Sequence, residues 1–292
     1  MKKTLLITGS TGFLGSNLIK KLIKKKYFII CLVRNKSNFE NIKHFTKRRY
    51  IKFFNYEKKK LRKVFLDYRI DGVIHCATNY GLNVTSSKEI IDSNLIFPLK
   101  ILELSVKSGV KFFINSDTIL DKNISEYTLS KNQFNEWLKL YSKQIKCCNI
   151  KLEHFYGPGD NKTKFVINLI LSLLSRKKNI DLTPGNQKRD FIYIDDVVEA
   201  FIKILDFALY NNFEYEEFEV GTQKYLQLKK FVAIVKKLSK NHETNLNFGA
   251  LKYRKGEKMN INVNIKSLKK IGWSPKVSLR QGLLKTIKYY GK

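Results

Sequence analysis

The 292-residue sequence has few acidic side chains, and this shortage is its most conspicuous chemical feature. It contains 25 Asp and Glu against 56 Lys and Arg, which gives a formal net charge of +31. Arginine is also scarce, because the basic residues are 47 Lys and only 9 Arg. Proteins that bind nucleic acids favour Arg for paired contacts to phosphates and bases. Since the lysines are scattered along the whole chain, the charge indicates a solvated, lysine-rich surface and not a nucleic-acid partner.

Long apolar runs are absent as well. No run reaches the ~18 residues that a membrane-spanning helix needs, so none is expected. The apolar stretch near the N-terminus ends at Thr8 and Gly9, which is too short for the core of a secretory signal. We therefore expect a cytoplasmic protein.

Cysteine is rare and has no pattern that binds metal. Cys31 and Cys76 lie inside apolar runs, and Cys147 and Cys148 are adjacent, with no CxxC spacing anywhere. We expect four reduced thiols and no metal site. The sequence is nevertheless not that of a disordered basic chain, because 43% of it is hydrophobic and it contains 20 Phe.

Short apolar runs alternate with amphipathic stretches in the first half of the chain. The expected strands cover residues 3–8, 27–33, 50–54, 71–77, 110–116 and 149–155. The expected helices cover residues 13–26, 86–108 and 125–146. This alternation predicts an α/β fold of the Rossmann type, a doubly wound parallel sheet with helices on both faces. The continuous apolar character of the strands fits burial on both sides.

After residue 157 the pattern changes to helices at 164–177, 195–209 and 228–240, with short strands near 190–193 and 217–220. No linker, low-complexity segment or internal repeat separates the two parts. We expect a first domain at 1–157 and a smaller α+β lobe at 158–292 that packs on it.

A glycine-rich turn follows the first expected strand and opens the first expected helix. Its sequence, GSTGFLG, has the spacing GxxGxxG. Glycines at such a turn allow the sharp bend, let the backbone approach a pyrophosphate, and let the helix pack on the sheet. The diphosphate of a dinucleotide then lies on the free N–H groups of the helix N-terminus. The expected cofactor contacts here are Gly9, Ser10, Thr11, Gly12, Phe13, Leu14 and Gly15.

The end of the second expected strand indicates which dinucleotide is bound. Enzymes that use NAD usually carry Asp or Glu here, which accepts hydrogen bonds from the ribose 2′-OH, whereas a basic side chain accommodates a 2′-phosphate. This chain has Arg34 and Lys36 instead. The sequence therefore favours NADP(H), with NAD as the alternative.

Tyr127 and Lys131 form a YxxxK motif that follows the fifth expected strand. On a helix, residues four apart share one face, so the Lys ammonium is expected to lower the pKa of the phenol. Lys131 can also hold the nicotinamide ribose. Such a Tyr exchanges a proton with a carbonyl or hydroxyl oxygen while a hydride moves to or from the cofactor. Ser116 closes the fifth strand, at the sheet edge where ligands collect.

These motifs resemble those of the extended short-chain dehydrogenase/reductase family, whose members act on nucleotide sugars. The resemblance implies that Ser116 hydrogen-bonds the reacting oxygen. It implies an adenine contact for Asn55, which occupies the place of a family Asp. The segment HCATNYG at 75–81 resembles a family segment that passes the cofactor. The resemblance implies that Ala77 and Thr78 contact the cofactor and that Tyr80 contacts the substrate.

One departure bears on the reaction. Family dehydratases usually carry Asp-Glu after the Ser or Thr, because removing water from the sugar needs an acid and a base beyond the tyrosine. This chain keeps Asp117 but has Thr118, which cannot be that base. The resemblance therefore disfavours a 4,6-dehydratase and leaves Asp117 and Thr118 as substrate contacts.

Three further segments resemble the family's substrate side. His154, in EHFYGPGD, stands where the family usually has an Asn. Arg189, in RDFIYIDD, and Arg254, in RKGE, match family arginines that reach the sugar-nucleotide diphosphate. A planar guanidinium suits a diphosphate better than a Lys point charge does. The segment IGWSP at 271–275 resembles the family's C-terminal turn, so the resemblance covers nearly the whole chain.

Within the family, the chain most resembles reductases of nucleotide-linked 4-keto-6-deoxyhexoses, which supply sugars for surface polysaccharides. The resemblance implies NADPH-dependent reduction at C4 and a homodimer. Two alternatives remain open: a 4-epimerase that retains NAD, and a non-catalytic dinucleotide sensor that binds RNA or a protein. Relatives of the second kind usually lack the Tyr–Lys pair, which is present here.

Overall fold

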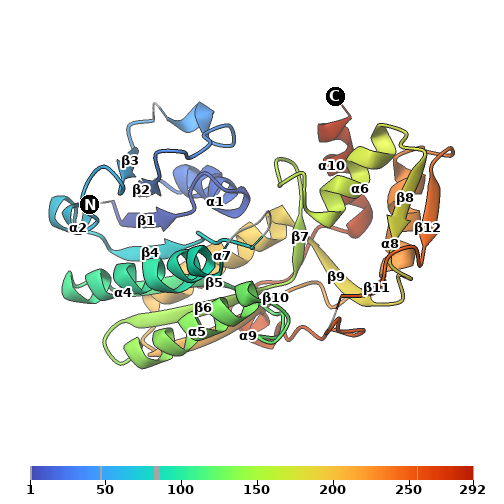
Figure 1. The fold of residues 1–292 in the computed structure, drawn as a ribbon. Helices are drawn as coiled ribbons and strands as arrows, with labels where there is room; N and C mark the ends of the chain where they lie inside the picture. The colour runs from blue at the N-terminus through green and yellow to red at the C-terminus, as the bar shows by residue number, and fades with distance from the viewer. Residues whose placement is uncertain (1, 47, 82–85, 255, 292) are drawn as a thin grey trace.

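The structure is a computed structural model that describes residues 2–46, 48–81, 86–254 and 256–291. Its larger part is a seven-stranded sheet of order β10-β6-β5-β4-β1-β2-β3, in which every neighbouring pair is parallel. The strands are β1 (Thr4–Thr8), β2 (Phe28–Val33), β3 (Ile51–Asn55), β4 (Gly72–His75), β5 (Phe112–Thr118), β6 (Lys146–Leu152) and β10 (Tyr215–Val220). The predicted Rossmann-type α/β fold is confirmed (Figure 1).

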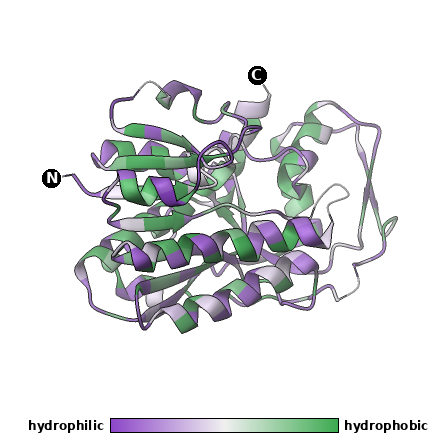
Figure 2. Cartoon of the chain, turned by 60° about the vertical axis from the view of Figure 1, so that its left-hand side comes forward, coloured by the Kyte–Doolittle hydropathy of each residue, from purple (hydrophilic) through white to green (hydrophobic). Residues whose placement is uncertain are grey.

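Each face of this sheet is covered by its own layer of helices. Successive side chains of a strand point to opposite faces, so an apolar strand has two apolar faces to bury. Leu5 and Ile7 of β1 belong to one buried cluster, and Leu6 between them belongs to the other. The first cluster includes α1 (Phe13–Lys24), α7 (Ile194–Tyr210) and α9 (Lys266–Lys270). The second includes α2 (Arg62–Asp67), α4 (Phe97–Lys107) and α5 (Glu126–Tyr141). Figure 2 shows the apolar strands enclosed between helices whose outer faces are hydrophilic.

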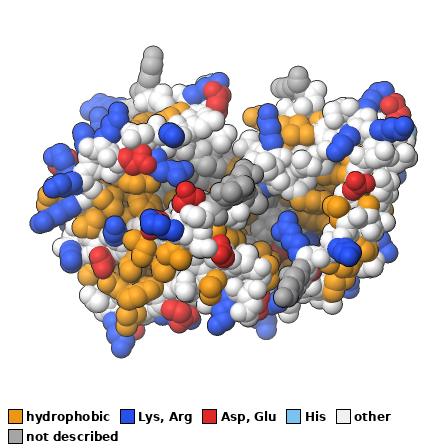
Figure 3. Space-filling view, in the orientation of Figure 1, with side chains coloured by type: hydrophobic (Ala, Val, Ile, Leu, Met, Phe, Trp, Pro, Cys, Tyr) orange, Lys and Arg blue, Asp and Glu red, His pale blue; other side chains and the backbone are white. Residues whose placement is uncertain are grey.

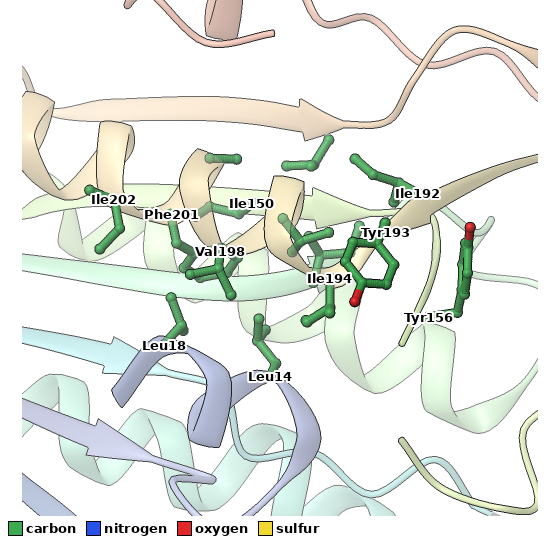
Figure 4. Close-up of a cluster of buried hydrophobic side chains, with 14 of the residues drawn as sticks. Leu14, Leu18, Ile150, Tyr156, Ile192, Tyr193, Ile194, Val198, Phe201 and Ile202 are labelled. Atoms are coloured by element: carbon green, nitrogen blue, oxygen red, sulfur yellow. The ribbon is translucent and has the colours of Figure 1, made fainter. Parts of the chain in front are cut away.

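Helix α1 is held in place on the sheet by its packing against α7. Figure 4 shows Leu14 and Leu18 of α1 facing Val198 and Phe201 of α7. All four side chains are buried, with exposures from 0 to 7%. Burying a side chain of this size stabilises a fold by about 1.5–3 kcal/mol. This packing holds α1, and therefore the glycine turn before it, in a fixed position.

The smaller part lies on the right in Figure 1 and contains two small sheets. One has the order β11-β9-β7 and the other pairs β12 with β8. Its strands are β7 (His154–Tyr156), β8 (Asn179–Leu182), β9 (Lys188–Tyr193), β11 (Tyr225–Gln227) and β12 (Asn245–Phe248). Its helices are α6 (Phe165–Leu174), α8 (Leu228–Leu238) and α10 (Leu279–Tyr290).

The division expected at residue 157 needs a correction. After β9 the chain returns to the large part, where α7 packs on the sheet and β10 pairs with β6. It then leaves again for β11, and α9 later packs against β10. The second part of the sequence therefore contributes to both parts of the structure.

The helix predicted at 86–108 is interrupted. The structure has α3 (Ser87–Ile91), a π-helical segment η2 (Asp92–Ile96) and then α4. Pro98, in the first turn of α4, has no N–H to donate to the carbonyl of Asn94. The ladder of hydrogen bonds therefore breaks where a widened turn is observed.

Some elements were missing from the sequence prediction. The strand predicted at 149–155 is two strands, β6 and β7, which belong to different sheets. The short strands β8, β11 and β12 and the helices α2, α9 and α10 were not predicted. Four of these, along with the 3₁₀ turn η1 (Lys43–Phe45), are five residues or fewer, which is too short to establish a periodicity. No helix among the described residues has the length and apolar character needed to span a bilayer.

Candidate active site

A cleft of about 1370 Å³ opens where the two parts meet, at the carboxyl ends of β1, β4 and β5. Figure 3 shows the hollow between them on one face of the molecule. In parallel sheets of this kind, ligands bind where the connections after two neighbouring strands lead toward opposite edges of the sheet. Here those two strands are β1 and β4. A cleft larger than the usual 300–1,000 Å³ has room for a dinucleotide and a second ligand.

The glycine turn forms one end of this cleft. Gly9 has a φ of +62°, and a Cβ there would lie 2.6 Å from the backbone of Cys76 and Ala77. A Cβ on Gly15 would collide with the carbonyl of Gly9. Helix α1 has no side-chain cap and no acidic residue in its first turn. Its free N–H groups thus suit an anion such as a dinucleotide diphosphate.

Most predicted cofactor residues lie in the cleft, and two do not. The residues that line it are Gly9, Thr11, Gly12, Phe13, Leu14, Gly15, Arg34, Ala77, Thr78 and Lys131. The side chain of Ser10 is buried, and its hydroxyl points toward the carbonyl of Leu32. Asn55 lies outside the lining and donates to Asn35 Oδ1 over 2.9 Å. Tyr56, the next residue, lines the cleft in its place.

The predicted reaction centre is assembled in the middle of the cleft, where Ser116, Tyr127 and Lys131 all contribute to the lining. Ser116 is near the end of β5, and the other two lie on α5. A capping box between Ser125 and Thr128 starts α5 and places Tyr127 in its first turn. Lys131 follows one turn later on the same face.

The ammonium group of Lys131 has no hydrogen-bond partner among the described residues, although the side chain is 1% exposed. Burial lowers the pKa of Lys131, while the carboxylate of Asp117 and the thiol of Cys76 raise it. A buried cation without acceptors is costly unless a ligand provides them. Ribose hydroxyl groups would do so, and together with the glycine turn this fits a bound nicotinamide dinucleotide.

The predicted effect of Lys131 on Tyr127 is not observed. Burial raises the pKa of Tyr127 well above its usual value, and so do the nearby Tyr80 and Asp117, whereas a hydrogen bond from Thr118 lowers it. The charge of Lys131 acts instead on Asp117, His75 and Cys76. Tyr127 is therefore held in its protonated form, which suits a proton donor.

Asp117 does not stand free in the cleft. Its Oδ1 accepts from the Thr118 N–H over 2.7 Å, and its Oδ2 accepts from Asn149 Nδ2 over 2.8 Å. Burial raises its pKa, and Lys131 and Asn149 lower it. Asn149 also donates to Glu217, which pairs with Lys151 at 2.6 Å. A polar network that the sequence did not reveal therefore runs from the reaction centre across β6 to β10.

Asn94, on the π-helical segment η2, supports the loop that carries Thr78 and Tyr80. Its amide donates to the carbonyl of Asn79 and to Ser130 Oγ, over 2.8 and 3.0 Å. Its oxygen accepts from the Asn79 N–H over 2.8 Å and from Thr78 Oγ1. The widened turn thus aims one buried side chain at both the cofactor loop and α5.

His75, by contrast, has a structural role. It lies outside the cleft lining, and its Nδ1 is 2.8 Å from the hydroxyl of Thr8. That hydroxyl already accepts from the N–H groups of Cys76 and Ala77, so it donates to Nδ1. Burial and Lys131 lower the pKa of His75 well below its usual value, so the ring is neutral in the folded protein.

Of the six predicted substrate contacts, five line the cleft and one does not. The five are Tyr80, Asp117, Thr118, His154 and Arg254. Arg189 does not, because its guanidinium donates to the carbonyls of Lys188 and Lys258 and pairs with Glu257. The role predicted for Arg189 at a diphosphate is therefore corrected: it ties β9 to the segment around residue 257.

A cationic group in the cleft was missed by the sequence analysis. The Nζ of Lys164 lies 4.6 to 5.6 Å from the ring centroids of Phe155, Tyr80 and Phe13. It also pairs with Asp160 at 3.0 Å. Lys164 ends a polar turn that also contains Lys162, directly before α6, and nothing in that pattern distinguishes it from the other lysines of the chain. No group of three side chains suited to a metal ion occurs among the described residues.

Comparison with known proteins identifies the family. Residues 5–221 match the NAD-dependent epimerase/dehydratase family. The chain belongs to this family. The match covers the seven strands of the large sheet and the small-sheet strands β7, β8 and β9.

Similar members of the NAD-dependent epimerase/dehydratase family include CDP-abequose synthases. The chain is 34% identical to the Salmonella muenchen protein over 98% of both chains, and 31% identical to the Salmonella typhimurium protein over 99% of this chain and 98% of that one. Among solved structures, UDP-glucose 4-epimerase of Thermotoga maritima has a TM-score of 0.85 at 24% identity, with 98% of each chain covered. At that identity, the likeness supports the fold.

Proposed function

We propose that the protein reduces the C4 keto group of a nucleotide-linked 4-keto-6-deoxyhexose, with NADPH, in the synthesis of surface-polysaccharide sugars. The observation that carries the proposal is the similarity to CDP-abequose synthases over nearly the full length of the chain. The cleft agrees with it, since Thr118 stands where a dehydratase needs a base, and the carboxylate of the adjacent Asp117 already accepts two hydrogen bonds.

The chemistry assigned to the chain's own residues is simple. The dinucleotide, when bound, supplies a hydride. Ser116 donates a hydrogen bond to the carbonyl oxygen of the substrate, and Tyr127 transfers its proton to the same oxygen as charge develops there. The ammonium of Lys131 donates to the ribose hydroxyls of the cofactor and so satisfies its buried charge. The raised pKa of Tyr127 keeps the proton available at neutral pH.

The test is oxidation of NADPH by the purified protein with a panel of CDP-, dTDP- and GDP-linked 4-keto-6-deoxyhexoses. We expect turnover with at least one of them and a product reduced at C4. No turnover with any member of the panel would overturn the proposal.

The choice of NADPH over NAD is a separate part of the proposal. It is supported by Arg34, which is exposed and lines the cleft beyond the end of β2. Replacing Arg34 with Asp should shift the ratio of kcat/KM values from NADPH toward NADH. Lys24→Asp, at the exposed end of α1, makes the same change of charge outside the cleft and should leave the ratio unchanged.

A second candidate is a nucleotide-sugar 4-epimerase that keeps NAD bound. It is favoured by a putative UDP-glucose 4-epimerase of Methanocaldococcus jannaschii, to which the chain is 27% identical over 98% of its length. Mass analysis of the purified protein distinguishes the two. Tightly held NAD and epimerisation without added cofactor support the epimerase, whereas a dependence on added NADPH supports the reductase.

A further inference from the structure

Glu153 is the single residue between β6 and β7, where the chain passes from the large sheet to the small one. Its side chain has no exposed surface, and it lines the cleft. The neighbouring Leu152 pairs with Thr118 of β5. Glu153 therefore lies just beyond the end of the strand that carries Ser116, on the substrate side.

The two oxygens of this carboxylate are in different situations. Oε1 is 2.5 Å from Nδ1 of His154, while Oε2 has no hydrogen-bond partner among the described residues. An ionised carboxylate only accepts hydrogen bonds, so Nδ1 carries the proton and donates it. The ring of His154 packs edge-on against Phe191, with centroids 5.9 Å apart. His154 is thereby fixed in place beside Glu153.

A desolvated carboxylate oxygen without a donor is costly, and no residue in the described part of the chain supplies one. The neighbouring acid is Asp190, whose pKa is raised by burial and by the charge of Glu153. Asp190 already accepts from the N–H groups of Thr222 and Gln223 and from the Thr222 hydroxyl. Oε2 of Glu153 is therefore available to accept a hydrogen bond from a bound ligand.

The chemistry of a sugar nucleotide decides which part of it can serve. A phosphate group has only acceptors at neutral pH and carries the same sign of charge as Glu153, so it is repelled. A hydroxyl group of the sugar ring is a neutral donor of the right kind. A hydroxyl–carboxylate hydrogen bond in a dry site is among the stronger ones.

We propose that Glu153 is a specificity-determining residue for the sugar: its Oε2 accepts a hydrogen bond from a ring hydroxyl, while its Oε1 positions His154 beside that ring. The inference rests on the proposed function in one respect, namely that the ligand is a nucleotide sugar. It assigns the Glu-His pair to the sugar and not to the diphosphate.

The experiment compares Glu153→Gln with the wild type by isothermal titration. Glutamine keeps the size of the side chain, and its carbonyl can still accept from His154, but an NH₂ group replaces Oε2. The probes are CDP-glucose, dTDP-glucose and UDP-glucose, each paired with its bare nucleoside diphosphate. We expect the variant to bind the NDP-glucose that the wild type binds most tightly about ten- to a hundredfold more weakly, and the bare diphosphate with unchanged affinity.

Two outcomes overturn the inference. In the first, Glu153→Gln weakens the NDP-glucose and the bare diphosphate equally, or neither of them. In the second, the wild type itself binds each NDP-glucose no more tightly than the bare diphosphate, a result that needs no variant. Glu243→Gln, at an exposed glutamate paired with Arg176, is the matched control. Because binding is measured without turnover, loss of the proposed reductase activity would leave this test intact.

Discussion

At the scale of single residues, the proton on Tyr127 is the feature that the reaction depends on most. Replacing Tyr127 with Phe removes the hydroxyl and keeps the ring, whose centroid lies 5.1 Å from the ring centroid of Tyr80. We expect kcat to fall about 10²- to 10⁴-fold, the usual contribution of a positioned acid, with little change in nucleotide-sugar affinity. Steady-state kinetics and titration of the variant check this. An unaffected kcat would remove Tyr127 from the mechanism.

The raised pKa of Tyr127 also fixes a pH dependence. Since the phenol normally titrates near pH 10 and burial moves its pKa upward, Tyr127 stays protonated from about pH 7 to 10. The rate of reduction at saturating substrate should therefore not fall on its account in that range. A loss of kcat centred near pH 7 or 8 would show that Lys131 controls the phenol after all.

His75 makes a prediction about stability. Its pKa is lowered in the folded protein, whereas in the unfolded chain it lies near 6.5. Below about pH 6.5, His75 is therefore protonated in the unfolded chain but not in the folded protein. As the pH decreases further, the free energy of unfolding falls by up to ~1.4 kcal/mol per pH unit. The free energy of unfolding, measured with urea at several pH values between 7.5 and 5, should fall less steeply with decreasing pH in His75→Gln than in the wild type. The exposed His242→Gln is the control and should keep the wild-type slope.

The residues also show where sequence reasoning ends. Ser116, Tyr127 and Lys131 were predicted because position after a strand and spacing along a helix bring them together. The pKa of Tyr127 could not be predicted, because it depends on burial and on Tyr80 and Asp117, which no spacing reveals. Arg189 fits a family motif, yet its guanidinium forms a salt bridge with Glu257 and does not face the cleft.

At the scale of elements, the π-helical segment η2 is the local irregularity that serves the cleft. Asn94→Ala would leave the N–H of Asn79 and the hydroxyl of Thr78 without their acceptor. We expect a loss of about 1–3 kcal/mol in the free energy of unfolding and weaker cofactor binding. Chemical denaturation checks the first and titration with NADPH the second. The same change at exposed Asn186 should have little effect on either.

The strands of the large sheet were predictable for a physical reason. A strand buried on both faces has to be apolar throughout, so β1, β2 and β4 stand out as runs in the sequence. Elements at the edges of small sheets have no such requirement, and β12 has mostly exposed residues. Only Pro98 could have shown that the helix after β4 is broken, and it says nothing about how the break is shaped.

At the scale of the whole molecule, we propose a homodimer formed through the helices on one face of the sheet. Exposed apolar side chains gather on α3, η2 and α5, which contact one another: Ile91, Ile96, Leu129, Trp137 and Leu140. Figure 3 shows apolar side chains collected at the lower left, over α4 and α5. A patch of this kind usually marks an interface.

Leu140 is 58% exposed and is the residue to change. Leu140→Lys should convert the dimer to a monomer in light scattering, because a lysine cannot be buried there without a partner. Leu284→Lys, the same exchange at an exposed site on α10, should leave the dimer intact. A wild type that is monomeric at high concentration contradicts the proposal.

The net charge of +31 predicts how substrate arrives rather than how it reacts. Figure 3 shows the basic side chains spread over the visible face, not collected in one stripe. Such a field attracts a polyanionic nucleotide sugar, and salt screens it. We expect kcat/KM to fall several-fold as salt rises from about 0.05 to 0.5 M while kcat stays level. A kcat that falls in parallel would point to an effect on the chemistry itself.

The path of the chain between the two parts has a consequence for folding and for movement. The polypeptide passes out of the large sheet at Glu153, returns at α7, and leaves again after β10. Neither part is a continuous stretch of sequence, so a protein cut at residue 157 would lose β10 from its sheet edge and α7 from its core. The two parts should therefore melt as one cooperative unit. Closure of the cleft cannot be a hinge motion about a single linker, because the chain crosses between the two parts several times and all of these connections must bend together.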